Sequence, residues 1–232
     1  MIQPNPSLGK EPTVNNDARI GTGHPGASDG DAATRTVGIL VFAEVEVLDF
    51  CGPFEVFASA ALPPADDGGE ERKLYDVRVV AEKPGIVRCR GGLLVQPHHT
   101  LADHPPLGLI VVPGGFGTRR EQRNPAVLGW IGRQHAGGAL TTSVCTGSFL
   151  LAGTGLLDGR AATTHWNHVD ALRAFRPAVH VRDDERIVDQ DRIVTSAGVS
   201  AGIDMALHVV RRQHGEEIAR HTARGMEYDW RG

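Results

Sequence analysis

Short apolar runs alternate with longer segments of helical spacing from about residue 36 onward. The runs at residues 37–42 and 109–112 are apolar along their whole length, without the alternation of a strand that has one face in water, and residues 75–81 and 139–144 are mixed runs of strand length. Such runs are typical of strands in a parallel sheet that is covered on both faces. The pattern therefore predicts buried strands over residues 37–42, 75–81, 109–112 and 139–144.

Helical spacing fills most of the segments between these runs. In residues 125–136, Val127, Leu128 and Ile131 share one face, while Asn124 suits the N-cap and Pro125 suits the first helical position. Strands that alternate with helices predict an α/β domain with a mostly parallel sheet and helices on both faces. Further helices are predicted after residue 53 as far as Pro63-Pro64, over residues 146–152, around 203–210, and from 216 to about 225. A charged loop over 65–73 and a hairpin around residues 87 and 94, turning at Gly91-Gly92, complete the expected elements.

The composition narrows the classes of function. Twenty-four Lys and Arg against 28 Asp and Glu give a formal charge of -4, so no basic surface for nucleic acid or an anionic membrane is expected. The chain has no apolar stretch that could span a bilayer and no signal peptide, which favours a cytoplasmic protein. Residues 1–34 are polar, rich in Gly and Pro and without periodicity, so we expect a disordered tail before a domain at 35–232.

The cysteines indicate thiol chemistry more than a structural role. Cys51, Cys89 and Cys145 are few, widely spaced and odd in number, which disfavours a disulfide framework. No Cys-x-x-Cys occurs, and the close histidine pairs have no obvious further ligands, so we expect neither a metal nor a cofactor. We place Cys51 in the core.

The strongest chemical signal is residues 142–148, where a buried strand runs into a helix almost without a loop. A residue at such a turn projects above the sheet, as in a nucleophile elbow, and Gly147 allows close backbone approach. Free N–H groups and the positive end of a helix dipole favour a thiolate at Cys145. The alternative is a buried, inert cysteine.

Two other loops are expected at the same edge of the sheet, since the carboxyl ends of parallel strands form one crevice. In Pro113-Gly114-Gly115, the N–H groups of Gly114 and Gly115 are expected to face an oxyanion or thiolate, although an ordinary turn has the same sequence. Asp49, between two apolar residues, is either a partly buried acid with a raised pKa or a helix cap.

Other polar residues have simpler interpretations. His165 is either a structural hydrogen-bonding residue or part of the site. Glu44 and Glu46 are expected to be solvated loop acids, and Asp204 to be a satisfied structural acid.

Taken together, residues 112–115, 143–148 and 198–204 carry a resemblance to the ThiJ/PfpI superfamily, which shares a flavodoxin-like sheet with class I glutamine amidotransferases. Within it, residues 48–53, the elbow and Ala-Thr-Thr-His-Trp at 162–166 resemble the isonitrile hydratase family. The resemblance implies addition of water to an isonitrile to give an N-substituted formamide. Cys145 would be the nucleophile, Asp49 the acid/base partner and Thr146 a hydrogen-bonding aid. We also expect Gly114, Gly115 and His165 to bind the substrate or to hold charge that develops on it.

The resemblance also leaves alternatives. Thr146 stands where protease-like members have histidine, and no downstream His-x-Glu completes an amidotransferase triad. The ligand-sensing half of AraC-type regulators is similar too, although we expect no helix-turn-helix in the short segment after Gly225. A stress protein in which Cys145 is oxidised is a third interpretation. By family analogy we expect a homodimer that acts on a small molecule, with no nucleic acid or membrane partner.

Overall fold

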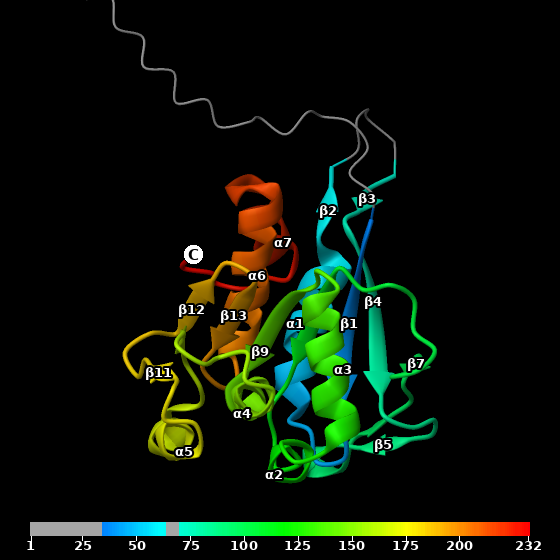
Figure 1. Cartoon of the computed structure of the whole chain (residues 1–232). Helices are drawn as coiled ribbons and strands as arrows, with labels where there is room; N and C mark the ends of the chain where they lie inside the picture. The colour runs from blue at the N-terminus through cyan, green and yellow to red at the C-terminus, as the bar shows by residue number, and fades with distance from the viewer. Residues whose placement is uncertain (1–33, 64–69) are drawn as a thin grey trace, which may run out of the picture. The chain divides into compact units, whose positions relative to one another are not determined.

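A seven-stranded sheet forms the centre of the computed structural model, which describes residues 34–63 and 70–232. Its strand order is β12-β13-β9-β8-β1-β4-β7, and the neighbours pair in parallel except for the antiparallel pair of β12 and β13. Figure 1 shows these strands with helices in front and behind. The strands are β1 Arg35–Val41, β4 Tyr75–Ala81, β7 His99–Thr100, β8 Leu109–Val112, β9 Leu140–Val144, β12 Ile187–Gln190 and β13 Ile193–Ser196.

The helices cover both faces, as the apolar runs predict. On one face α1 packs against α6, and α6 against α7, whereas α3 and α4 pack together near β9. Every residue of β8 and β9 is buried, because these central strands have neighbours on both edges and both faces. The helices are α1 Val47–Ser59, α2 Thr118–Glu121, α3 Pro125–Ala136, α4 Ser148–Gly153, α5 Val169–Phe175, α6 Ala201–His214 and α7 Glu216–Gly225.

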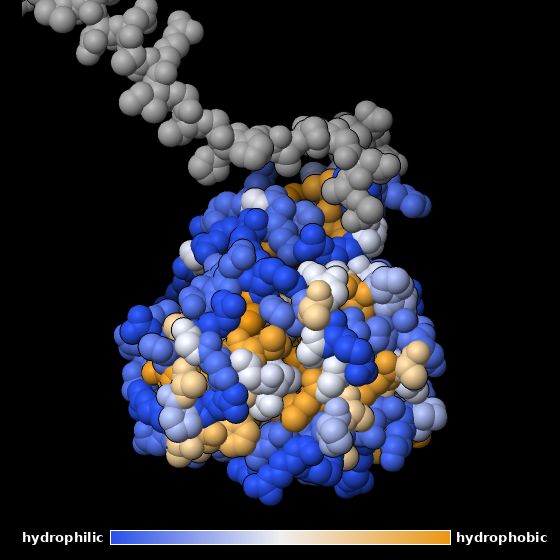
Figure 2. Space-filling view, viewed as in Figure 1, coloured by the Kyte–Doolittle hydropathy of each residue, from blue (hydrophilic) through white to orange (hydrophobic). Residues whose placement is uncertain are grey.

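Three short two-stranded sheets lie outside the main one. The predicted hairpin is present as β5 (Val87–Arg88) and β6 (Leu94–Val95), which pair in antiparallel fashion around the 3-10 turn Arg90–Gly92. The other two sheets join β2 (Ala61–Leu62) to β3 (Arg72–Lys73), and β10 (Ala161–Ala162) to β11 (His180–Val181). Figure 2 shows that hydrophilic residues cover most of one face of the molecule, with small hydrophobic patches between them.

The predicted fold class is confirmed, and the corrections concern element ends and additional short strands. The first helix begins at Val47 and already ends at Ser59, because β2 follows before Pro63. Residues 72–73 are strand β3 rather than loop, while the rest of that predicted loop lies largely outside the described residues. The expected tail, except for Thr34, also lies outside them.

The strand order places a crevice at one edge of the sheet. The order reverses at β1 and β8, and ligands of such sheets bind at the carboxyl ends of the strands beside this reversal. In Figure 1 this edge is at the bottom, where α2, α4 and the start of α1 gather. The three loops that the sequence predicts to converge leave β1, β8 and β9 at this edge.

Among the described helices, none has the length and apolar character needed to cross a membrane.

Candidate active site

Cys145 occupies the predicted strand-to-helix turn in a backbone conformation that few residues adopt. It follows β9 directly, begins the 3-10 turn Cys145–Gly147 and has φ of 58°. The backbone N–H of Cys145 donates to the carbonyl of Ala197 (3.2 Å), while its carbonyl accepts from the hydroxyls of Thr164 (2.9 Å) and Ser148 (3.1 Å). A left-handed residue persists when its surroundings fix it, and such residues cluster at functional sites.

Gly147 allows the turn to lie against the neighbouring strand. A Cβ at this position would come 2.0 Å from the carbonyl oxygen of Val112, the last residue of β8. Any larger residue would push the elbow away from β8. Gly147 therefore keeps the Cys145 side chain close to the loop that follows β8.

Asp49 is a fully buried acid beside this cysteine. It lies in the first turn of α1, and its Oδ2 accepts a hydrogen bond of 2.9 Å from the N–H of Gly114. Oδ1 is buried without a nitrogen or oxygen partner among the described residues, and the carboxyl interacts with the Cys145 thiol. Burial raises the pKa of Asp49 to about 7 and Glu46 adds to the rise, although the Gly114 hydrogen bond opposes it. Asp49 is thus not a helix cap but an acid that titrates near neutral pH.

The thiol of Cys145 differs from the sequence-based expectation. Burial raises its pKa above the ordinary value, and the charge of Asp49 raises the pKa further, while the N–H of Thr146 opposes the rise. The resting sulfur is therefore a protonated thiol rather than the thiolate predicted from the helix dipole, because the site is buried and already holds a carboxyl. A nucleophilic sulfur here needs a base, and Asp49 is the group in contact with it.

The glycines after β8 position the acid and a hydroxyl, which corrects their expected role. The N–H of Gly114 donates to Asp49, and the N–H of Gly115 donates to Oγ1 of Thr146 at 3.1 Å. Neither is therefore free to face developing charge on a substrate. The N–H of Thr146 instead hydrogen-bonds to the Cys145 sulfur, as does the hydroxyl of Thr146.

A pocket of about 350 Å³ opens above the sulfur. Cys145 lines it, although only 6% of this residue is exposed, whereas the fully buried Asp49 does not line it. A small molecule in the pocket could therefore contact the sulfur, which also interacts with the Asp49 carboxyl. The lining residues are Glu46, Arg90, Gly115, Phe116, Arg119, Cys145, Thr146, His165, Asn167, His168 and Val199.

His165 lies in the wall of this pocket. Its Nδ1 accepts from the N–H of Asn167 at 3.2 Å, and burial lowers the pKa of its ring. Beside it, a Cβ at Gly198 would come 2.4 Å from the His165 ring and 2.9 Å from the Cys145 sulfur. His165 thus has a structural hydrogen bond and also lines the pocket, and its part in binding a substrate stays a prediction.

Sequence reasoning missed the charged rim of the pocket. Glu46 was expected to be a solvated acid, but its side chain is only 21% exposed and pairs with Arg90 at 2.9 Å. Phe116 contacts two guanidinium groups, with the Arg90 group 4.4 Å and the Arg119 group 5.0 Å from the ring centre. The signal in the sequence is weak, because these residues come from three separate loops. Their proximity follows from the convergence of those loops.

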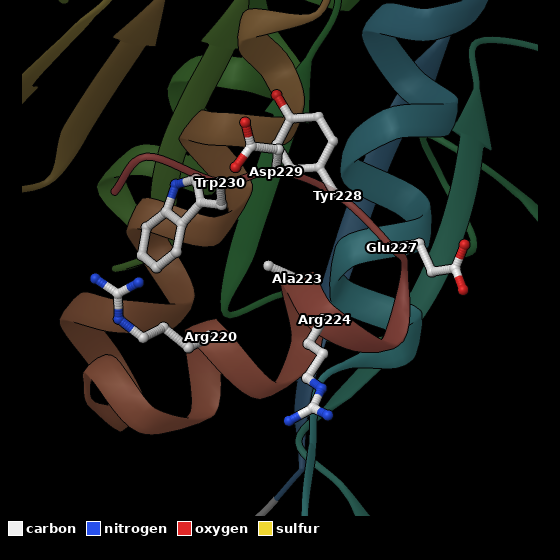
Figure 3. Close-up of a pocket in the computed structure, with 7 residues that line it drawn as sticks. All are labelled: Arg220, Ala223, Arg224, Glu227, Tyr228, Asp229 and Trp230. Carbon is white, nitrogen blue, oxygen red and sulfur yellow. The ribbon is translucent and has the colours of Figure 1, made fainter.

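A second pocket lies at the other end of the molecule. It has a volume of about 530 Å³ and surrounds the segment after α7, where the side chain of Arg220 lies beside Trp230 (Figure 3). Figure 1 shows α7 at the top, whereas the carboxyl ends of the parallel strands are at the bottom. Nearby, Asp204 accepts from Arg186 (2.6 Å) and from Tyr228 (3.0 Å), as expected for a satisfied structural acid. This pocket contains no cysteine, and we assign it no chemistry.

Metal ligands are not grouped in the part of the chain that the structure describes. No set of three or more His, Cys, Asp or Glu residues there could hold a metal ion. The interactions of Cys145 are with Asp49 and Thr146, which form a thiol–carboxyl pair with a hydrogen-bonding neighbour. The chemistry that this arrangement supports is nucleophilic attack by sulfur combined with proton transfer.

The fold and the elbow define a flavodoxin-like protein with a cysteine at the carboxyl edge of its sheet. The chain belongs to the DJ-1/PfpI family, whose model matches residues 35–212. It is 36% identical over 192 residues to an isonitrile hydratase of Pseudomonas putida, covering 83% of this chain and 78% of that protein. It is also similar to a solved ThiJ/PfpI family protein from Pseudomonas syringae, with a TM-score of 0.74, 30% identity and coverage of 85% and 76%.

Transcriptional regulators are also among the relatives. The regulator CdhR of Pseudomonas aeruginosa is 33% identical over 163 residues, which are 70% of this chain but only 48% of the regulator. The chain thus spans about half the length of that relative. The family therefore includes both a named enzyme and regulators, and its membership alone does not assign a reaction.

Proposed function

We propose that this protein is a cysteine-dependent hydratase that adds water to an isonitrile and releases an N-substituted formamide. The observation that carries the proposal is the contact between a protonated Cys145 and a buried Asp49 that titrates near pH 7. The similarity to the Pseudomonas putida isonitrile hydratase supports the choice of substrate.

The first half of the reaction begins with Asp49 ionised, so that Cys145 and Asp49 together hold one proton, which is on the sulfur. Asp49 accepts the thiol proton as the sulfur forms a bond to the terminal carbon of the isonitrile. The electron pair that develops on this carbon then takes the proton back from Asp49, which gives a thioimidate with a C–H bond. Asp49 ends this half as a carboxylate, ready to act again.

The second half consumes one water molecule. The oxygen of the water attacks the thioimidate carbon while Asp49 accepts one of the water protons. The carbon–sulfur bond then breaks. One water proton ends on nitrogen and the other on the sulfur, so the products are the formamide and the original thiol. The N–H and hydroxyl of Thr146, which hydrogen-bond to the sulfur, stabilise it as the leaving group.

The test is incubation with cyclohexyl isocyanide, followed by chromatographic detection of N-cyclohexylformamide. Wild-type protein should form the product, and Cys145→Ala should not. Cys51→Ala provides the matched control, because it removes another free thiol that does not line the pocket. Absence of turnover by the wild type, or equal turnover by Cys145→Ala, would refute the proposal.

The second candidate function is ligand sensing without catalysis. It is favoured by the match to regulators, in which the shared segment is only part of a longer chain. A sensor needs the pocket but not a proton relay. Asp49→Asn should therefore abolish turnover in a hydratase, whereas in a sensor it should only alter ligand affinity.

A further inference from the structure

One cation in the pocket wall has no acidic partner among the described residues. The guanidinium of Arg119 contacts the Phe116 ring and lies 3.4 Å from Nε2 of His168. Among the residues that the structure describes, no carboxylate forms an ion pair with Arg119. An arginine that lines a pocket and is held by an aromatic ring and an imidazole is oriented to bind a planar anion with its free N–H groups.

The charges around the pocket do not cancel this cation. Glu46, the only carboxylate among the described lining residues, is already paired with Arg90 at 2.9 Å. His165 and His168 also line the pocket, and neither supplies a negative charge in any protonation state. Asp49 is fully buried, does not line the pocket and interacts with Cys145. The rim therefore presents one uncompensated positive charge.

We propose that Arg119 binds an acidic group of the substrate, so that the natural substrates are small isonitriles that carry a carboxylate. This inference rests on the proposed hydratase function for the isonitrile end of the molecule. The assignment of a carboxylate to the other end of the substrate rests on Arg119 alone. The pocket has a volume of about 350 Å³ and is lined by both Cys145 and Arg119, so one small molecule in it can contact the sulfur and the guanidinium together.

The experiment compares ω-isocyano carboxylates of two to five carbons with their methyl esters. Wild-type kcat/KM should favour the acid over the ester at one or more chain lengths, and the preference should fall as salt is added, because the attraction is electrostatic. Arg119→Gln should lower kcat/KM for the acid by about tenfold or more, as expected for loss of a hydrogen bond between charged groups, and leave the ester little changed. Arg123→Gln, an exposed arginine outside the pocket, is the matched control.

A binding measurement separates this inference from the hydratase proposal. N-formyl amino acids resemble the products, and their binding to the wild type and to Arg119→Gln can be measured by calorimetry. Hydration of cyclohexyl isocyanide without any preference for acids would overturn the role of Arg119 and leave the hydratase intact. Binding of formyl amino acids that depends on Arg119, without hydration of any isonitrile, would support the anion site and refute the hydratase. Equal affinity of both proteins for the formyl amino acids would refute the anion site.

Discussion

Replacing Asp49 by Asn should stabilise the folded protein at alkaline pH while it removes catalysis. Asn has nearly the same shape, and its side-chain oxygen can still accept the hydrogen bond from the N–H of Gly114. It carries no charge at any pH. The substitution therefore removes the cost of holding an ionised carboxyl in the core and leaves the packing almost unchanged.

The size of this effect follows from the pKa of Asp49, which burial raises from 3.8 to about 7. Below pH 4 the carboxyl is protonated in both the folded and unfolded states, so it does not make stability depend on pH. Between pH 4 and 7 it ionises in the unfolded chain but stays protonated in the folded protein, so folded stability falls as pH rises. Above pH 7 the loss is complete and amounts to about 4 kcal/mol, at 1.36 kcal/mol per pKa unit.

Urea unfolding at pH 5 and pH 8.5, at constant ionic strength, measures the effect. The free energy of unfolding of Asp49→Asn relative to wild type should rise between these two values by about 3 kcal/mol, because only the roughly two pKa units between pH 5 and about 7 fall inside this range. Asp191→Asn is the matched control, because Asp191 is exposed and its φ of 62° is one that Asn also tolerates. A difference between Asp49→Asn and wild type that stays constant across this pH range would refute the assignment of a buried carboxyl with a raised pKa.

Three further outcomes follow from the same geometry. The kcat/KM for cyclohexyl isocyanide should rise with pH through about 7 and then level off, because Asp49 must be ionised to accept the thiol proton; a rate that is independent of pH between 5.5 and 8.5 would contradict this. Gly198→Ala should lower kcat/KM at least tenfold with an unchanged circular dichroism spectrum, since the added Cβ would lie 2.9 Å from the Cys145 sulfur. Thr164→Val should lower the free energy of unfolding by about 1 kcal/mol in urea titrations, because the Cys145 carbonyl loses a donor, and an unchanged midpoint would argue against this role of the hydroxyl.

The architecture could be predicted because local patterns determine most of it. Strand β8 and most of β1 appear as apolar runs, β9 is a mixed run rich in β-branched residues, and α3 has its cap and its proline in sequence. The strands β12 and β13 were not predicted. Their β-branched residues are a signal, but short runs near polar segments resemble loops until a neighbouring strand covers them.

The site could be predicted only in part, because its electrostatics depend on tertiary burial. The elbow at Cys145 follows from a strand that runs into a helix, and the left-handed φ of 58° agrees with that. The protonation of the sulfur does not follow from the local sequence, since it depends on how deeply Asp49 and Cys145 are enclosed. The pairs of Glu46 with Arg90 and of Arg119 with His168 join residues from separate loops, and no spacing in the sequence indicates them.

A buried thiol with a raised pKa suits isonitrile hydration for a chemical reason. The carbon that the sulfur attacks must also receive a proton, so an enzyme with a free thiolate would need a separate acid. Cys145 and an ionised Asp49 share one proton, and Asp49 can take it from sulfur and return it to carbon without another group. Because Arg119 lines the pocket and Asp49 does not, one substitution can weaken binding of an acidic group and another can abolish proton transfer. Asp49→Asn therefore tests proton transfer, which a hydratase needs and a sensor does not, whereas Arg119→Gln tests only the binding of an acidic group.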